Sequence, residues 1–359
     1  MSDPITTIRS LAGQLGLSRT TVSDALRGRG RMAASTRQRV IRNAATAGYQ
    51  VNPLTATVLA EIRRTRSSAY RGTIAVVDVR EESHWPHGPF PLQVIAGARD
   101  AASALGFLTE QFTVGNLALS WTRLDSILYS RRIHGVIVLP AWQEPDLSVL
   151  DWSRYAGIYT DHRIVPPGLH SVCTDHYGSM MALLELLRRR GYRRIGLMLD
   201  TGRDERIYYA QSAAFTAFHR AQGIAAPVPT LITENYPPRY EDEFAPWFRR
   251  HHPDVVLSHF AETLAWIKRC RLRTVETGFV ILNVIEKIVP CAGLDLQPRV
   301  IGRRAAELVV GQLLRNELGV PACPSRTTIL ARWVEGPTVR PGALYPQAVS
   351  RLPGLGTWK

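Results

Sequence analysis

The feature that most constrains the fold is a series of short apolar runs that alternate with amphipathic segments from residue 71 onward. The runs that read as buried strands are 73–79, 135–140, 194–199, 254–259 and 278–283. Amphipathic segments expected to be helices lie between or after them, near 92–105, 119–130, 176–190, 206–222 and 297–316. Buried strands alternating with helices predict βαβ units in doubly wound parallel sheets. Because at least two such sets are present, we expect two similar lobes rather than one wide sheet.

The N-terminal segment has a different pattern, which predicts a small all-α unit. Residues 6–27 read TTIRSLAGQLGLSRTTVSDALR, with apolar residues at helical spacing on each side of Gly16. The inward positions of the first helix are Ile8, Leu11, Ala12 and Leu15, and those of the second are Val22, Ala25 and Leu26. Gly16 suits the turn between them, and Ser18 is a residue type that begins helices. Two short helices across such a turn form a helix-turn-helix.

A third helix is expected at about 35–47, ending at Gly48, with Val40, Ile41 and Ala44 facing inward. The charge of this segment points to a polyanion. Residues 1–70 hold eleven arginines, no lysine and three acidic residues, a net charge of +8, whereas the other 289 residues share +6 of the total +14. Positive charge concentrated in one small domain is typical of nucleic-acid binding, whereas a merely solvated surface would spread it.

Several classes of protein are disfavoured. The four cysteines (173, 270, 291 and 323) are widely spaced, so we expect neither a metal site nor a disulfide framework, and no cofactor. No apolar run approaches the length of a membrane span, and the N-terminus lacks a signal peptide's apolar core, so we expect a cytoplasmic protein. Motifs of serine hydrolases, phosphate-binding loops and zinc proteases are missing, and Cys173 near His176 reads as a buried thiol beside a surface histidine, so we expect no enzyme.

One long run of sequence resembles a known family. Residues 7–53, TIRSLAGQLGLSRTTVSDALRGRGRMAASTRQRVIRNAATAGYQVNP, are similar to the headpiece of the lac-repressor (LacI/GalR) family. The matching positions are Ala12, Gly16, Ser18, Thr21, Val22, Ser23, Leu26, Thr36, Arg37, Arg39, Val40, Gly48, Tyr49, Asn52 and Pro53. Weaker similarity continues through 171–199 and 302–314.

The resemblance implies a helix-turn-helix headpiece at 1–52, a hinge helix and linker at 53–70, and a two-lobed, effector-binding and dimerising body at 71–359. This body should be an α/β domain like a periplasmic sugar-binding protein. The first lobe is expected at about 71–170 and 296–322, and the second lobe at about 171–295 and 323–340.

The second helix of a helix-turn-helix enters the DNA major groove. By resemblance, Arg19, Thr20 and Asp24 occupy the base-reading positions. Arg19 suits guanine, which a guanidinium can contact through two hydrogen bonds. Asp24 departs from the arginine usual in the family, so it reads either as a cytosine contact or as an ion-pair partner that orients Arg27 or Arg19.

Other residues are expected to position the DNA. Phosphate contacts are assigned to Thr6, Thr21, Ser23, Arg31 and Arg37. The segment 52–59 resembles the family's hinge helix, whose apolar side chain wedges into the minor groove, and Val58 or Leu59 would supply that wedge here. A plain linker helix is the alternative.

The effector site is expected in the crevice between the lobes, at the carboxyl ends of the strands. By resemblance its polar residues are Gln211, His259 and Asn283, which replace the usual Arg, Asn and Asp. Arg206, Asp161 and Asp175 are candidates to compensate, and Trp85 and Phe90 are candidates to stack on a sugar ring. The alternatives are a structural role for His259 and loop packing for Trp85.

Together these features predict a sequence-specific transcription regulator, with repression as the default. It would bind a double-stranded operator as a homodimer and respond to a sugar or another small metabolite. Its alternative is a regulator that has lost the sugar site and responds to a partner protein or an unusual metabolite. A stand-alone sugar-binding protein would not explain the headpiece.

Overall fold

The computed structural model divides into two compact units, Met1–Ala69 and Tyr70–Lys359. The structure describes residues 8–26, 32–46, 70–79, 88–115, 118–141, 146–162, 166–234, 239–270 and 277–342. Among these residues, no helix is both long and apolar enough to cross a membrane.

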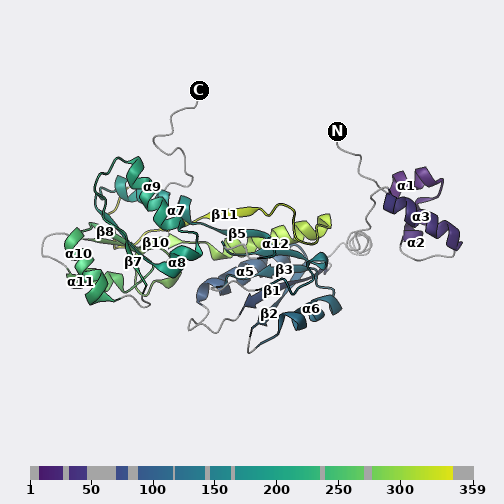
Figure 1. Ribbon diagram of the computed structural model, residues 1–359, viewed down its shortest axis with the longest axis horizontal. Helices are drawn as coiled ribbons and strands as arrows, with labels where there is room; N and C mark the ends of the chain where they lie inside the picture. Colours follow the sequence, from purple (N-terminus) through teal and green to yellow (C-terminus); the bar gives the residue numbers. More distant parts are fainter. Residues whose placement is uncertain are drawn as a thin grey trace, which may run out of the picture. The chain divides into compact units, whose positions relative to one another are not determined.

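The described residues of the N-terminal unit form three helices, α1 (Ile8–Leu15), α2 (Arg19–Leu26) and α3 (Ala34–Thr46), which lie close to the predicted ranges (Figure 1). They pack around a small core made of Leu11, Ala12, Val22, Ala25, Val40 and Ala44. The prediction that Ile41 faces inward is wrong: its side chain is 48% exposed. At helical spacing Val40 and Ala44 share one face, and Ile41 is turned away from it.

The turn between α1 and α2 depends on two residues that the sequence indicated. Gly16 has a φ of +63°, a conformation that costs glycine little because it has no Cβ. The Leu17 N–H next to it donates to the Ala12 carbonyl oxygen at 3.0 Å. At the start of α2, the Ser18 hydroxyl accepts a hydrogen bond from the Thr21 N–H at 3.1 Å, as an N-cap residue does.

The larger unit contains two sheets, each of which defines a lobe. The first sheet has the order β11-β5-β4-β3-β1-β2, and all its neighbouring strands are parallel. Its strands are β1 (Gly72–Val79), β2 (Phe107–Val114), β3 (Gly135–Val138), β4 (Ala156–Tyr159), β5 (His170–Asp175) and β11 (Arg326–Leu330). The helices of this lobe are α5 (Pro89–Ala104), α6 (Trp121–Ser130), α12 (Pro298–Arg315) and the short 3-10 helix η1 (Trp152–Arg154).

The second sheet has the order β12-β10-β9-β8-β6-β7, and it is parallel except for the antiparallel edge strand β12. Its strands are β6 (Ile195–Asp200), β7 (Leu231–Thr233), β8 (Val255–Ser258), β9 (Gly278–Ile281), β10 (Ala292–Asp295) and β12 (Arg332–Val334). Its helices are α7 (His176–Arg189), α8 (Thr201–Arg206), α9 (Ala210–Ala221), α10 (Ala245–His251) and α11 (Thr263–Cys270), with short helical turns η2 (Tyr240–Phe244) and η3 (Val284–Glu286).

The sheet pairing corrects the predicted lobe boundaries. We expected residues 171–175 and 326–330 in the second lobe, but β5 and β11 pair with each other in the first sheet. The helix predicted near 206–222 corresponds to α9, which begins at Ala210, and the separate helix α8 ends at Arg206. Tyr208 and Tyr209 have φ values of 54° and 58° between the two helices, and this left-handed backbone cannot continue an α-helix.

Close packing of α5 against α12 forms one side of the first lobe. A Cβ added to Gly97 would lie 2.0 Å from the Arg299 carbonyl oxygen, and one added to Gly302 would lie 1.9 Å from the Val94 carbonyl oxygen. Glycine at both positions therefore lets the two helix backbones approach each other. This packing holds the beginning of α5, which reaches the cavity described below.

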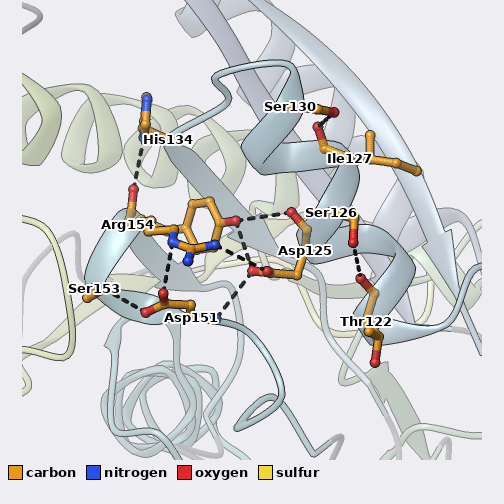
Figure 2. A network of polar contacts seen from close by, with 10 residues as sticks. Thr122, Asp125, Ser126, Ile127, Ser130, His134, Asp151, Ser153 and Arg154 are labelled. Atoms are coloured by element: carbon orange, nitrogen blue, oxygen red, sulfur yellow. Dashed lines mark hydrogen bonds and ion pairs between the residues drawn. The ribbon is translucent and has the colours of Figure 1, made fainter.

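A polar network supports the amino ends of β3 and β4 (Figure 2). The Asp125 carboxylate on α6 accepts a hydrogen bond from the buried Tyr155 hydroxyl at 2.9 Å and one from the Asp151 N–H at 3.2 Å. Arg154 pairs with Asp151 at 2.8 Å, and its carbonyl oxygen lies 2.9 Å from His134 Nδ1. Burial, and then the Asp125 carboxylate, raise the pKa of Tyr155. The network lies at the opposite ends of the strands from the cavity.

Candidate functional site

A cavity of about 210 Å³ lies between the two lobes of the larger unit. Its walls are largely built by residues that follow strands of both sheets: Pro140 and Ala141 after β3, Thr160, Asp161 and His162 after β4, His176 after β5, Arg203 and Arg206 after β6, His259 after β8, and Asn283 and Glu286 after β9. The carboxyl ends of parallel strands in α/β folds are the usual place for ligands. The volume is below the range of about 300–1,000 Å³ typical of drug-sized ligands, so it suits a small one.

Arg206 joins the two lobes across this cavity. Its guanidinium forms an ion pair with the Asp161 carboxylate, and its Nε donates to the Ala141 carbonyl oxygen at 3.2 Å. The Arg206 and Asp161 side chains are only 20% and 12% exposed. In this arrangement the Arg206 side chain therefore links the two lobes.

Arg203, one turn earlier on α8, is paired within the second lobe. Its guanidinium donates to both oxygens of the Glu286 carboxylate, at 2.9 and 2.8 Å. The Arg203 N–H donates to the Asp200 carboxylate at 2.8 Å, which caps the start of α8. Each arginine on the cavity wall thus has a carboxylate partner.

Three histidines form a continuous group on the wall. The rings of His162 and His176 have centroids 4.7 Å apart. Burial lowers the pKa of His162 to about 3, helped by Arg326 and Arg206, and burial next to His162 lowers the pKa of His176 to about 3. Burial, and then Arg203 and His176, lower the pKa of His259. All three imidazoles are consequently neutral at physiological pH.

The hydrogen bond of one of these rings defines its tautomer. His259 Nε2 lies 2.9 Å from Gln211 Oε1, which can only accept, so the neutral ring donates from Nε2 and carries its lone pair on Nδ1. A hydrogen bond to the Thr174 backbone acts in the opposite direction to burial on the pKa of His162, but burial outweighs it. Neither His259 Nδ1 nor His162 Nε2 has a hydrogen-bond partner among the described residues.

The rest of the wall is apolar. Its members are Val79, Phe90, Pro91, Pro140, Ile207, Leu296 and Ile301. Phe90 packs against the core of the second lobe as well as against Val76, Val94 and Leu139 of the first. The site therefore combines neutral hydrogen-bonding groups with apolar surface.

Five of the residues predicted to bind an effector lie on this wall: Phe90, Asp161, Arg206, His259 and Asn283. Gln211 is buried behind His259, which it orients. Asp175 lies at the N-cap of α7, where its carboxylate accepts from the Gly178 N–H at 2.7 Å. Trp85 lies outside the described residues.

Sequence reasoning missed six polar residues of the wall, Thr160, His162, Thr174, His176, Arg203 and Glu286. The prediction that His176 is a surface residue is wrong, because its ring is packed beside His162 on the cavity wall. The strand before it has the mixed sequence HSVCTD, so no apolar run indicated that His176 follows a buried strand. Cys173 also lies on the wall, buried, and burial raises its thiol pKa to about 12, so it is not an activated nucleophile.

Although three imidazoles are close together, the part of the chain that the structure describes contains no group of three or more His, Cys, Asp or Glu placed to hold a metal ion. Hydrogen bonding is thus the chemistry that these rings offer.

The residues predicted to contact DNA belong to the N-terminal unit, which the structure describes in part. Thr6, Arg31, Val58 and Leu59 lie outside the described residues, and of Arg19, Thr20 and Ser23 only the helical backbone of α2 is described. The Thr21 hydroxyl lies 2.8 Å from the Ser18 hydroxyl. Asp24 and Arg37 are half-buried, and each has an interaction partner.

Comparison with known proteins gives relatives of one kind. No family model matches the chain. It is 28% identical over 200 residues to an HTH-type transcriptional regulator of Mycolicibacterium smegmatis, covering 55% of this chain and 52% of the relative. It is 19% identical over 314 residues to the HTH-type transcriptional regulator MalR of Staphylococcus xylosus, covering 85% and 90%. The chain spans about half the length of the M. smegmatis regulator and of a Mycobacterium tuberculosis regulator that it also matches.

Solved structures with the same fold align with nearly the whole chain. The transcriptional regulator CelR in complex with cellobiose has a TM-score of 0.56 and 19% identity over 93% of this chain and 99% of that one. The lac repressor dimer bound to operator and an anti-inducer has a TM-score of 0.52 and 16% identity over 93% and 98%. A LacI-family regulator from Silicibacter pomeroyi has a TM-score of 0.52 and 20% identity over 94% and 100%. The resemblance predicted from the sequence is thus confirmed, and the chain has the fold of LacI-family transcriptional regulators.

Proposed function

We propose that this chain is a sequence-specific DNA-binding transcription regulator whose operator affinity is modulated by a small molecule bound between its two lobes. The observation that carries the proposal is the presence, on one chain, of an arginine-rich three-helix unit and a two-lobed body with a polar cavity at the carboxyl ends of its strands. Neither the three-helix unit nor the two-lobed body alone would suggest that ligand binding controls DNA binding. The relatives support the proposal, because they are named HTH-type transcriptional regulators, and a regulator of the same fold was solved with cellobiose.

The DNA end of the proposal rests on α1 and α2, which a turn at Gly16 joins at the spacing of a helix-turn-helix. In this assignment α2 enters the major groove, and Arg19, Thr20 and Asp24 read base edges. Phosphate contacts come from Thr6, Thr21, Ser23, Arg31 and Arg37, and Val58 or Leu59 wedges into the minor groove. The headpiece is assigned to 1–52, and the hinge and linker to 53–70.

The dimer is proposed from two considerations. One small headpiece reads a short site, and a two-fold symmetric pair reads two half-sites at a defined spacing. The lac repressor structure that shares this fold is a dimer on its operator.

The ligand end of the proposal rests on the cavity itself. The cleft between the lobes encloses about 210 Å³ lined by hydrogen-bonding groups, and a similar regulator was solved with cellobiose. A site that had been lost would be expected to be filled by side chains. Ligand binding is therefore favoured over the alternative of a partner protein that replaces the metabolite.

Selection of duplexes from a random library tests the proposal. The full chain should enrich an inverted repeat, and the chain without residues 1–60 should enrich no sequence and bind DNA at least about a hundredfold more weakly. The shortened chain keeps the whole of the larger unit, so its fold is checked by circular dichroism. Equal DNA affinity of the two proteins would show that the headpiece assignment is wrong.

A further inference from the structure

The charges on the cavity wall limit the ligands that it can take. Within the described residues, the wall has two cationic side chains, and both are paired: Arg203 with Glu286, and Arg206 with Asp161. The three imidazoles are neutral. A bound phosphate or carboxylate would have to displace a carboxylate from one of these arginines, or remain buried without a counter-charge, which is costly.

The wall carries buried imidazole nitrogens that are available to hydrogen-bond a ligand. His259 Nδ1 is a lone-pair acceptor, because Nε2 of the same ring donates to Gln211 Oε1. His162 Nε2 and His176 Nδ1 are further buried ring nitrogens of the wall that have no partner among the described residues. The His162 and His259 side chains are more than nine-tenths buried, and His259 Nδ1 also has no partner in the described parts of the chain. Buried polar atoms without partners are rare in native proteins, and a ligand is one reason for them.

The nitrogens His162 Nε2 and His259 Nδ1 come from different lobes. His162 follows β4 in the first sheet, and His259 follows β8 in the second. The ring of His176, directly after β5, has its centroid 4.7 Å from that of His162. Protein atoms cover both His162 Nε2 and His259 Nδ1 in this arrangement. A ligand that hydrogen-bonds both nitrogens would therefore contact residues of both lobes.

We propose that the cavity selects an uncharged small molecule that offers a hydrogen-bond donor to His259 Nδ1 and a second hydrogen-bonding group to His162 Nε2, and that these two histidines determine its specificity. The inference rests on the proposed function, since it concerns the same effector site. It narrows the effector from metabolites in general to uncharged compounds rich in hydroxyl or N–H groups. Phosphorylated and carboxylated compounds are excluded.

Binding measurements on the full chain with matched probe pairs test the charge selection. Suitable pairs are glucose with glucose 6-phosphate, cellobiose with cellobionate, myo-inositol with inositol 1-phosphate, and adenosine and cytidine with their 5′-monophosphates. Thermal shift identifies binders, and titration calorimetry measures their Kd. At least one uncharged member should bind, with its charged counterpart at least tenfold weaker. Binding of charged members alone, or of no uncharged member, overturns the proposal.

Crossed amide substitutions test the two nitrogens. An asparagine amide lies near the position of Nδ1 and a glutamine amide near that of Nε2, and either amide can donate or accept. H162N keeps a group near Nδ1 and loses the one at Nε2, whereas H162Q keeps a group at the Nε2 position. At His259 the roles are reversed, so H259Q keeps the partner of Gln211 and loses the acceptor, whereas H259N keeps a group at the acceptor position.

H162N and H259Q should each weaken binding of the uncharged probe by about tenfold, the cost of one hydrogen bond of roughly 1.4 kcal/mol. H162Q and H259N should weaken it less. The matched control is H219N, because His219 is a buried histidine of α9 that lies outside the cavity and has Nδ1 2.8 Å from the Phe215 carbonyl oxygen. It should leave the Kd unchanged. The proposal is overturned if the same amide, asparagine or glutamine, weakens binding more at both positions. Equal Kd values for all four variants also overturn it.

DNA-binding assays of the same proteins separate this inference from the proposed function. If the full chain binds its selected operator and only a charged compound alters that binding, the regulator assignment stands and the inference fails. If an uncharged probe binds with the crossed pattern but the chain binds no DNA, the inference stands and the regulator assignment fails.

Discussion

The Arg206 guanidinium, at the end of α8 in the second lobe, forms an ion pair with the Asp161 carboxylate after β4 in the first lobe. The pair is largely shielded from water and has a second inter-lobe contact, since Arg206 Nε also donates to the Ala141 carbonyl oxygen. Ligand binding between the lobes must either keep this pair or replace it. The pair is therefore a direct link between the cavity and the relative position of the lobes.

A double-mutant cycle of R206A and D161A should give a coupling free energy of about 1–3 kcal/mol, measured by urea unfolding. The reason is that truncating either partner alone leaves a shielded charge without its counter-ion. The matched control is the exposed pair of Arg304 and Glu307 on α12, at 2.9 Å, which should give less than about 1 kcal/mol. Equal coupling in both cycles would show that the inter-lobe pair is no stronger than a surface contact.

Acid should destabilise the protein through its buried histidines. The pKa of His162 is about 3 in the folded chain, below the ordinary histidine value of 6.5, so the unfolded chain takes up the proton first as the pH falls. Stability is thus complete above about pH 6.5 and decreases between pH 6.5 and 3, by about 1.4 kcal/mol per pH unit for this one residue. Urea unfolding of the wild type and of H162N at pH 7 and pH 5 measures this loss of stability.

H162N should show a pH dependence that is smaller by roughly that slope, because it lacks the titrating ring. The pKa values of His176 and His259 are also lowered by burial, so a residual dependence in the same direction is expected. Identical pH dependence in the two proteins would contradict the assignment of His162 as a buried neutral ring.

The close contact of α5 and α12 predicts opposite effects for two alanine substitutions in one helix. G302A should destabilise the body by about 1–3 kcal/mol, because its Cβ would lie 1.9 Å from the Val94 carbonyl oxygen and the helices would have to separate. G311A meets only the flexible end of Arg315, at 3.1 Å, so it should stabilise α12 by about 0.5–1 kcal/mol. Urea midpoints that shift in the same direction would contradict this account of the packing.

The parts of the fold that the sequence predicted are those with strong local patterns. Five strands of the larger unit, β1, β3, β6, β8 and β9, are continuous apolar runs because they are covered on both faces. The strand β2 was missed because it lies at a sheet edge, where its sequence FLTEQFTV mixes polar and apolar residues and Leu108 is 60% exposed. The strand β5 was missed because its sequence HSVCTD mixes polar and apolar residues, and β4 is a run of only four residues, AGIY.

The candidate site was predicted in part for a similar reason. His259 and Asn283 follow apolar runs directly, so their place at strand ends could be inferred. His162 and His176 flank the unrecognised strand β5, and they meet only because the sheet places β4 beside β5. The break at Tyr208 and Tyr209 depends on left-handed backbone at two tyrosines, which residue type does not suggest.

The assignment of base-reading residues on α2 predicts two different kinds of DNA-binding loss. R19A should relax specificity at one base pair, with about 1–3 kcal/mol less discrimination there, because a guanidinium that contacts guanine is removed. R37A, assigned to a phosphate, should weaken binding uniformly across sequences and reduce its salt dependence. Affinities for the selected operator and its single-base variants distinguish the two. A uniform loss in R19A would reassign Arg19 to the DNA backbone.

The most direct test of the central claim is the effect of the effector on DNA affinity. Fluorescence anisotropy of the selected operator with the full chain should give Kd values that differ by about 5- to 150-fold with and without a saturating uncharged ligand, and the operator should alter ligand affinity by the same factor. That result would establish that the cavity and the headpiece are coupled. An unchanged operator Kd with the cavity occupied would contradict the account.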